Sequence, residues 1–168
     1  MKNLLLATNL GVNSQQALER ALLVARLHNA ALHVIHVASA HGGAAEEELA
    51  RQVAAAVAFL EAQLPEEFGA GFEPASFKSV AGDPVQAIVA EADTCDADLT
   101  ITGLSEKSGA RGLIDGTILE RLLMASAKPS IVVKSRPVRN YESVLVGLDL
   151  SSTSRHALEA ALRIAPTA

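Results

Sequence analysis

A glycine-rich stretch over residues 103–117 holds the side chains best suited to chemistry. It opens with Gly103, closes with Gly116 and Thr117, and carries Lys107 near its middle. Glycines let backbone N–H groups point at an anion, and a lysine ammonium and a threonine hydroxyl add donors. The stretch follows a strand pattern and precedes a helical pattern, which is where open α/β sheets bind ligands. It therefore predicts a phosphate-binding loop, although taken alone it also fits a plain surface loop.

Other reactive residue types fit structural roles better. His33 and His36 are three apart in a strand pattern, which puts them on opposite faces and favours packed or capping histidines over a shared metal site. Cys95 has acidic neighbours, which raise a thiol pKa and disfavour a reactive thiolate. The serines within 151–154 lack a nucleophile-elbow pattern and read as a turn with a helix cap.

Composition restricts the protein to a few classes. Of 168 residues, 49% are hydrophobic and 3% aromatic, so the core must be built from Ala, Val, Leu and Ile. The net charge of −5 and the scattered Lys and Arg residues argue against nucleic acid as a partner. The longest apolar stretches fall well below the ~18 residues of a membrane span. One cysteine allows no intrachain disulfide, and without a signal-peptide pattern the expected location is the cytoplasm.

Strand and helix patterns alternate along the chain. Gly82, Asp83 and Pro84 are typical of a helix start, since they supply a turn, a cap and a first helical residue. The alternation predicts an α/β fold with an open, mostly parallel five-stranded sheet and helices on both faces. The predicted strands cover residues 4–8, 32–37, 72–80, 99–102 and 131–133, and the predicted helices cover about 14–25, 46–64, 84–92 and 118–123.

The end of the chain repeats its beginning at a period of about 140 residues, which indicates a duplicated domain. Ser14 and Ser154 are the predicted helix caps of the two copies. We predict one domain over residues 1–137, then a linker and the first strand and helix of a second, incomplete copy over 138–168. The identical pairs are Leu5 and Leu145, Leu10 and Leu150, Ser14 and Ser154, Ala17-Leu18-Glu19 and Ala157-Leu158-Glu159, Ala21-Leu22 and Ala161-Leu162, and Ala25 and Ala165.

A lone strand–helix unit cannot bury its own faces. The tail therefore belongs to a longer tandem protein, or it packs on the first domain or on a partner chain.

The glycine-rich stretch resembles the nucleotide loop of the universal stress protein family, which reads Gly-x-x-Gly, nine residues, then Gly-Ser or Gly-Thr. Gly103 matches the first glycine, and Gly116 and Thr117 match the closing pair. Lys107 and Gly109 stand where the family often has a basic residue and a glycine. The resemblance implies an adenine nucleotide α-hydrolase-like, Rossmann-like fold.

The resemblance covers residues 2 to about 136 and starts again at about 142. Its strength lies in the order and spacing of several motifs rather than in any one. The further motifs are Gly82-x-Pro84 followed by Ile88, Ala97-Asp98-Leu99 at the fourth strand, and Pro129 before the fifth strand.

The chain departs from the family pattern at two places. Family members that bind ATP have an acidic residue at the end of the first strand, near the ribose, and use the glycine loop for the phosphates. This chain has Asn9 at that first-strand place, and Asp149 occupies the matching place in the second copy. Glu106 replaces the second loop glycine and brings a carboxylate toward the phosphates. The resemblance implies ATP as ligand, with Mg²⁺ only alongside the nucleotide. The implied binding residues are Asn9, Gly103, Glu106, Lys107, Gly109, Gly116 and Thr117.

The resemblance implies a non-catalytic stress-response regulator. Family members pair through their fifth strands, so we expect a homodimer formed through Ile131–Lys134. One alternative is an interaction or dimerisation scaffold that has lost ATP binding. A nucleotide-hydrolysing or nucleotidyl-transferring enzyme is less favoured, because the first strand ends in Asn9-Leu10-Gly11-Val12-Asn13-Ser14 and not in a pyrophosphatase-type Ser-Gly-Gly-x-Asp-Ser loop.

Overall fold

A five-stranded sheet in the order β3-β2-β1-β4-β5 organises the protein. The computed structural model describes residues 1–38, 45–63, 68, 71–104, 117–137 and 139–165. Each neighbouring pair of strands is parallel, which confirms the predicted α/β fold class and puts β1 at the centre. The strands are β1 (Asn3–Thr8), β2 (Ala31–Ala38), β3 (Ser76–Ala81), β4 (Leu99–Gly103) and β5 (Ser130–Val133).

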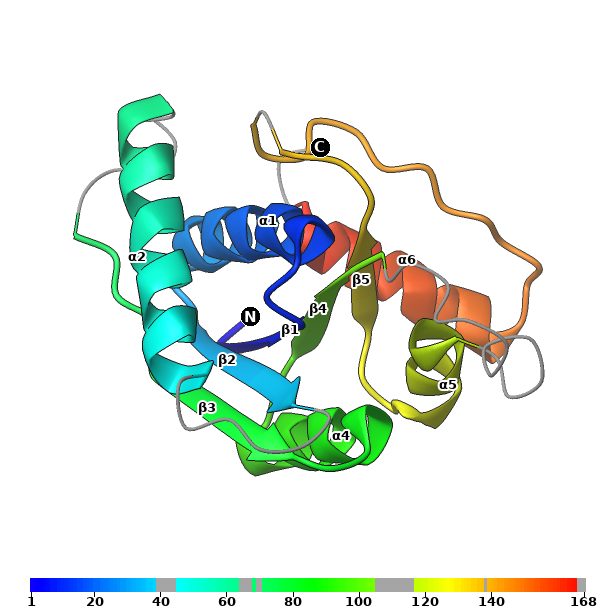
Figure 1. Ribbon diagram of the computed structural model, residues 1–168. Coiled ribbons are helices and arrows are strands. Elements are labelled where there is room, and N and C mark those ends of the chain that lie inside the picture. The colour runs from blue at the N-terminus through cyan, green and yellow to red at the C-terminus, as the bar shows by residue number, and fades with distance from the viewer. Residues whose placement is uncertain (39–44, 64–67, 69–70, 105–116, 138, 166–168) are drawn as a thin grey trace.

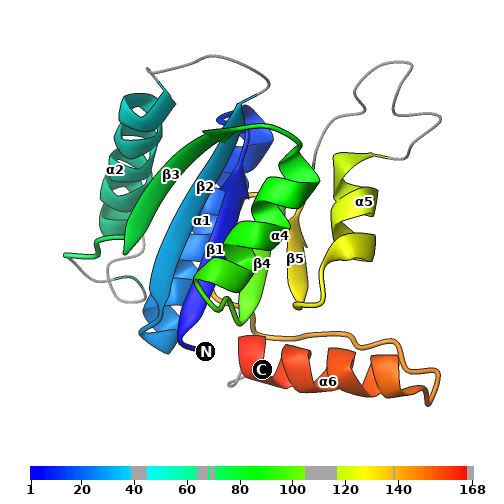
Figure 2. The ribbon, with the colours of Figure 1, turned by 90° about the horizontal axis from the view of Figure 1, so that it is seen from below.

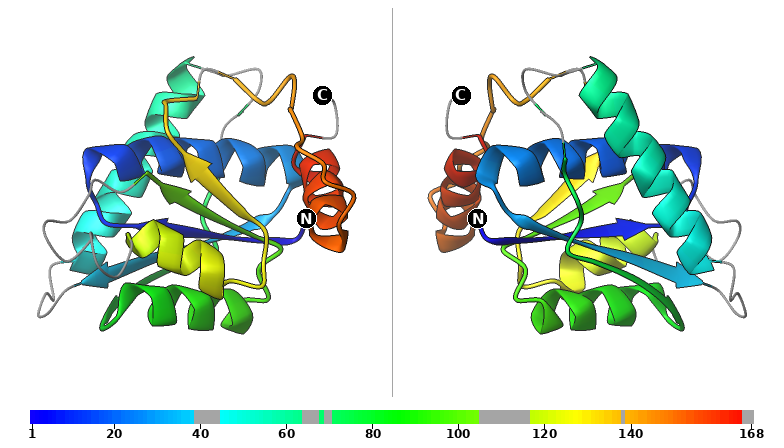
Figure 3. Two further views of the ribbon diagram at one scale, coloured as in Figure 1. Left: turned by 90° about the vertical axis from the view of Figure 1, so that its right-hand side faces the viewer. Right: turned by 90° about the vertical axis from the view of Figure 1, so that its left-hand side faces the viewer.

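Helices cover both faces of the sheet, as predicted (Figures 1 and 3). One face carries α1 (Val12–His28) and α2 (Ala45–Gln63), and the other carries α4 (Pro84–Thr94) and α5 (Ile118–Ala125). A last helix, α6 (Ser152–Ile164), lies beyond the amino ends of the strands, outside both layers (Figure 2). In the part of the chain that is described, no helix combines the length and the apolar character needed to cross a bilayer.

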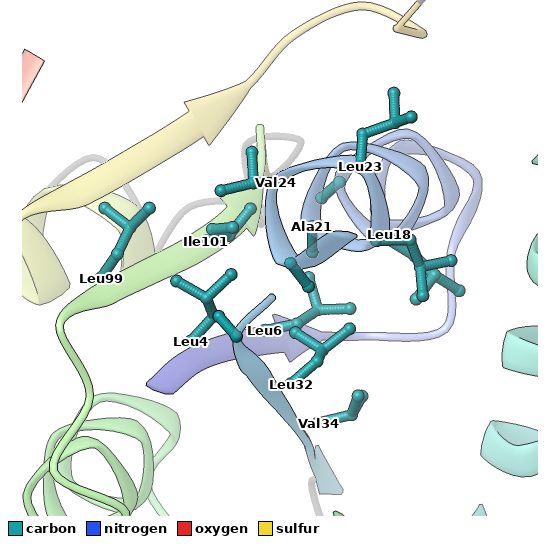
Figure 4. Close-up of a cluster of buried hydrophobic side chains, with 14 of the residues drawn as sticks. Leu4, Leu6, Leu18, Ala21, Leu23, Val24, Leu32, Val34, Leu99 and Ile101 are labelled. Carbon is teal, nitrogen blue, oxygen red and sulfur yellow. The ribbon is translucent and has the colours of Figure 1, made fainter. Parts of the chain in front are cut away.

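The core consists of two hydrophobic clusters, one on each face of the sheet, and β1 contributes to both. Successive side chains of a strand alternate between faces. Leu4 and Leu6 therefore pack toward α1, as Figure 4 shows, while Leu5 and Ala7 pack toward α4. All three leucines of β1 are fully buried, which is typical of a parallel strand covered on both faces.

Two elements begin more than one residue away from their predicted starts. The α1 helix begins at Val12 with Gly11 at the N-cap position, so Ser14, predicted as the cap, lies within the first turn. β3 begins at Ser76 rather than at residue 72. Pro74 precedes it, and proline has no N–H for a ladder hydrogen bond, which delays the start of pairing.

The start of α4 confirms its prediction. Asp83 is the N-cap, and its carboxylate accepts a hydrogen bond from the Gln86 N–H at 3.0 Å, with Pro84 at the first helical position. Gly82 has a φ of 142°, which a residue with a Cβ would adopt only under strain. The Gln86 N–H, followed by the Arg121 guanidinium of α5 at 3.0 Å, lowers the pKa of Asp83. This ion pair joins the two helices of that layer.

After β5 the chain crosses α1 through residues 134–137 and 139–141, which we call the strap. Arg136 donates two hydrogen bonds, of 2.8 and 2.6 Å, to the carboxylate of Glu19. The Glu19 side chain is fully buried, and its carboxylate raises the pKa of Arg136. The Arg20 guanidinium lies 4.0 Å from the centre of the Tyr141 ring, a cation–π contact. Helix α1 therefore holds the strap at two successive residues of its own.

The C-terminal region matches its prediction only in part. Helix α6 forms, but the strand predicted before it is absent, and residues 141–150 contain no strand. A strand needs a neighbour for its backbone hydrogen bonds, and no described strand pairs with this segment. Leu145 remains 99% exposed. The far end of α6 is attached, since the His28 ring nitrogen lies 3.3 Å from the Ile164 carbonyl oxygen and Ala165 is buried.

Candidate functional site

The strand order reverses between β1 and β4. The chain moves outward from β1 through β2 to β3, then returns to the other side of β1 with β4. Ligands of open α/β sheets bind at the carboxyl ends of strands at such a reversal. Ala7 pairs with Thr102, so Asn9 and Gly103 follow at neighbouring strand ends. Two of the predicted site residues therefore meet at this edge.

Asn9 sits in a tight turn between β1 and α1 that fixes its side chain. Its Oδ1 accepts hydrogen bonds from the Gly11 N–H at 2.9 Å and from the Ser14 hydroxyl at 2.5 Å. The Asn9 N–H donates to Ser14 Oγ at 3.1 Å. Leu10 between them has a φ of 61°, in the left-handed region. A Cβ on Gly11 would lie 3.0 Å from Asn9 Oδ1, so glycine gives this side chain its room.

Side chains from β2 and α2 support the same turn. The His36 ring donates from Nδ1 to the Thr8 carbonyl oxygen at 3.0 Å, and these two residues pair in register across β1 and β2. Gln52 of α2 donates to the Leu10 carbonyl oxygen at 3.3 Å. Neither contact was predicted, because both depend on strand register and helix packing that no local motif encodes.

Gln52 also donates to Glu48 at 2.8 Å, which brings one carboxylate toward the turn. Arg51 binds that carboxylate through hydrogen bonds of 2.8 and 2.6 Å. Arg51 and then Gln52 lower the pKa of Glu48, so it stays ionised and paired. The Glu48 carboxylate is thus linked to the turn through Gln52 as half of an ion pair.

Gly103 and Thr117 mark the two ends of the predicted nucleotide loop. Gly103 is the last residue of β4, is buried and pairs with Val133 of β5. Thr117 is the N-cap of α5, where its Oγ1 accepts from the Glu120 N–H at 3.2 Å. The Glu120 carboxylate accepts from the Thr117 N–H at 2.6 Å, completing a capping box. Helix α5 therefore begins at a fixed residue, and the Thr117 hydroxyl keeps its proton as a donor.

The rest of the predicted loop lies outside the described residues. These positions are Glu106, Lys107, Gly109 and Gly116. Their assignment continues to rest on the sequence pattern.

The other reactive residue types make structural contacts. His33 Nδ1 lies 2.8 Å from the Ser76 hydroxyl of β3. Burial, with a further contribution from Glu91, raises the pKa of the Cys95 thiol, which agrees with the predicted direction. Among the residues that the structure describes, no three His, Cys, Asp or Glu side chains gather where they could hold a metal ion.

The turn at Asn9 has a counterpart at Asp149, and the two share a left-handed residue and a backbone N–H bond to the side chain. The Ser151 N–H donates to Asp149 Oδ1 at 2.9 Å, and the Asp149 N–H lies 3.4 Å from Ser154 Oγ. Leu150 has a φ of 65°. The N-cap of α6 is Ser151, whereas Ser154, predicted as the cap, lies one turn further on, as Ser14 does in α1. Hydrogen bonds from Ser151 and Ser154 lower the pKa of Asp149 to about 2.

A doubly wound α/β domain with a polar turn at its switch point defines a class of ligand-binding proteins. Within that class, the sequence matches the model of the universal stress protein family over residues 1–134. The chain belongs to this family. No curated protein sequence matches it significantly.

Solved structures share the fold at low sequence identity. A universal stress protein in complex with cAMP superimposes with a TM-score of 0.62 and 22% identity, over 79% of this chain and 95% of that one. A universal stress protein from Archaeoglobus fulgidus in complex with dAMP gives a TM-score of 0.54 and 20% identity, over 79% and 97% of the two chains. A protein of the universal stress protein family from Burkholderia pseudomallei gives a TM-score of 0.53 and 20% identity, over 79% of this chain and 95% of that one.

Proposed function

We propose that this protein is a non-catalytic stress-response regulator that binds an adenine nucleotide across the carboxyl ends of β1 and β4. The observation that carries the proposal is the Asn9 turn, which presents a fixed polar side chain beside Gly103 at the point where strand order reverses. The ribose would lie against Asn9, and the phosphates would lie against the 103–117 loop and the first turn of α5. ATP is the expected nucleotide, with Mg²⁺ bound only alongside it.

Two related structures support the choice of nucleotide. They are universal stress proteins in complex with cAMP and with dAMP. Both ligands are adenine nucleotides, and both chains match about four-fifths of this one.

Glu106 is the residue that most opposes nucleotide binding. A carboxylate ~4 Å from a phosphate costs about 1–4 kcal/mol, depending on the local dielectric. That penalty corresponds to about a tenfold to thousandfold loss of affinity. If the penalty prevails, the competing function is that of an interaction scaffold whose nucleotide site has been lost.

Calorimetric titration of the full chain with ATP and Mg²⁺ tests the proposal. We expect binding by the wild-type chain, and tighter binding by Glu106→Gly because the carboxylate is removed. Glu73→Gly makes the same change at an exposed residue before β3, at the opposite end of the sheet, and should leave affinity unchanged. Binding by Glu106→Gly alone would assign the wild-type chain to the scaffold function. Absence of binding by all three proteins would refute the nucleotide site.

We further propose that the protein forms a homodimer through β5. This strand is at the edge of the sheet, so one side of its backbone has no neighbouring strand in the described fold. Light scattering over a range of concentrations should give a mass of two chains. A Val132→Pro variant removes one backbone donor from the edge through which the dimer is proposed to form. A monomeric wild-type chain would contradict the proposal.

A further inference from the structure

The turn at Asn9 presents a hydrogen-bond donor to the ligand edge. The Gly11 N–H can only donate, so the Asn9 atom that faces it at 2.9 Å must be the amide oxygen. The Ser14 hydroxyl donates to the same oxygen at 2.5 Å. The exposed end of the side chain is therefore the Nδ2 group, which carries two N–H donors and no charge. No described residue accepts a hydrogen bond from it.

The matching turn presents the opposite chemistry. At Asp149 the inner oxygen accepts from the Ser151 N–H at the same distance, 2.9 Å. The outer atom of that side chain is a carboxylate oxygen, which accepts hydrogen bonds and carries negative charge. One backbone geometry therefore offers a neutral donor at residue 9 and an anionic acceptor at residue 149.

This difference bears on which sugar the Asn9 turn accepts. A carboxylate at a ribose subsite accepts hydrogen bonds from free ribose hydroxyls and repels a phosphate on the sugar, as the dinucleotide-binding folds illustrate. An amide Nδ2 group donates to phosphate oxygens and adds no negative charge. Glu48 of α2, which Gln52 links to the turn, is held in an ion pair with Arg51 and adds little net charge.

We propose that Asn9 is a specificity-determining residue that admits nucleotides with a phosphate ester on the ribose ring. The inference rests on the proposed nucleotide site and concerns only its sugar specificity. Besides ATP, the turn would then accept adenine nucleotides phosphorylated at the 2′ or 3′ position of the ribose. Asn9→Asp would restore selection for an unmodified ribose.

We expect the variant to keep the fold, because an aspartate oxygen can accept the Gly11 N–H as Asp149 accepts the Ser151 N–H. A thermal melt followed by circular dichroism verifies this. Asp149→Asn is the matched control, since it makes the reverse change in the matching turn, which lies before α6 at the opposite end of the molecule (Figure 2).

The test measures calorimetric affinities of the full chain for adenosine 5′-monophosphate, adenosine 3′,5′-bisphosphate and adenosine 2′,5′-bisphosphate. We expect the wild-type chain to bind at least one bisphosphate as tightly as the monophosphate. Asn9→Asp should lower the affinity for that bisphosphate by about tenfold or more and change the affinity for the monophosphate by less than about threefold. Asp149→Asn should not change the ratio of the affinity for either bisphosphate to the affinity for the monophosphate.

The outcomes separate the inference from the function beneath it. An unchanged ratio in Asn9→Asp, or an altered ratio in Asp149→Asn, would overturn the role of Asn9 while nucleotide binding stands. Loss of all binding, in the wild-type chain and in a Glu106→Gly background alike, would overturn the nucleotide site and the inference with it. The Glu106→Gly background also keeps the ratio measurable if the wild-type affinity is low.

Discussion

Residues 3–28 and 143–165, here called the N-terminal and C-terminal units, carry nearly the same pattern but differ in structure. Their turns share a backbone N–H bond to the side chain of Asn9 or Asp149 and a left-handed residue, Leu10 or Leu150. They differ at the serine, because the Ser14 hydroxyl donates to Asn9 whereas the Ser154 hydroxyl donates to the Ser151 carbonyl oxygen. The N-terminal unit supplies the central strand of the sheet, whereas the C-terminal unit has a helix and no strand. The turn and the helix are thus specified locally. The strand and its burial require neighbouring strands, which only the first unit has in the described fold.

The largest effect should separate the identical leucines of the two units. Leu5 is fully buried and Leu145 is 99% exposed. Leu5→Ala should lower the free energy of unfolding by about 2–5 kcal/mol, since it removes buried apolar groups and leaves a cavity. Leu145→Ala should change it by less than about 0.5 kcal/mol. Urea denaturation of both variants measures the difference. A comparable loss in Leu145→Ala would show that the C-terminal unit is buried in solution, by a partner chain or by this one.

The paired glutamates should show a smaller contrast. Glu19 is buried and binds Arg136 through two hydrogen bonds, whereas Glu159 is exposed and lies 3.9 Å from Arg155. Glu19→Gln should lower the free energy of unfolding by about 1–3 kcal/mol. We expect the lower end of this range because Arg136 is half-exposed and can be rehydrated. Glu159→Gln should cost less than about 0.5 kcal/mol. The same denaturation series measures both. Equal effects would mean that the Arg136–Glu19 ion pair contributes no more to stability than the exposed Glu159–Arg155 pair.

The smallest effect is a pH dependence confined to the C-terminal unit. The serine hydrogen bonds lower the pKa of Asp149 to about 2, below the ordinary 3.8. A depressed pKa means that the stabilisation is complete above pH ~4 and is lost as pH falls through about 2. Carboxyl-carbon NMR should follow Asp149 to a midpoint near 2, and Asn9 gives no such titration. A midpoint near 3.8 would indicate that the second turn is not formed in solution.

Most of the fold was predictable because it depends on local patterns. The alternation of strands and helices, the Asp83 cap and the parallel sheet all follow from periodicity and capping chemistry. Errors arose where a local signal competed with another. Ser14 has the chemistry of a cap, but the turn uses its hydroxyl to hold Asn9. The apolar pattern around Leu145 predicts a strand, but the segment has no neighbouring strand in the described fold. Sequence periodicity does not report whether such a neighbour is present.

The candidate site was predictable in position but not in detail. The sequence places Asn9 and Gly103 at strand ends, and the register brings those ends together. Which end of the Asn9 amide faces outward could not be predicted, because it depends on the Gly11 N–H and the Ser14 hydroxyl in three dimensions. The contacts from His36 and Gln52 depend on register and helix packing in the same way.

The strap has a mechanical consequence. Once α6 is detached from His28, a pulling force on the C-terminal unit would reach the Arg20–Tyr141 contact, then the Arg136–Glu19 ion pair, before it could peel β5 from the sheet. Both contacts are anchored on α1, which packs on the central strand rather than on the edge. Tension would therefore be carried into the middle of the domain, and the edge strand would be shielded from it.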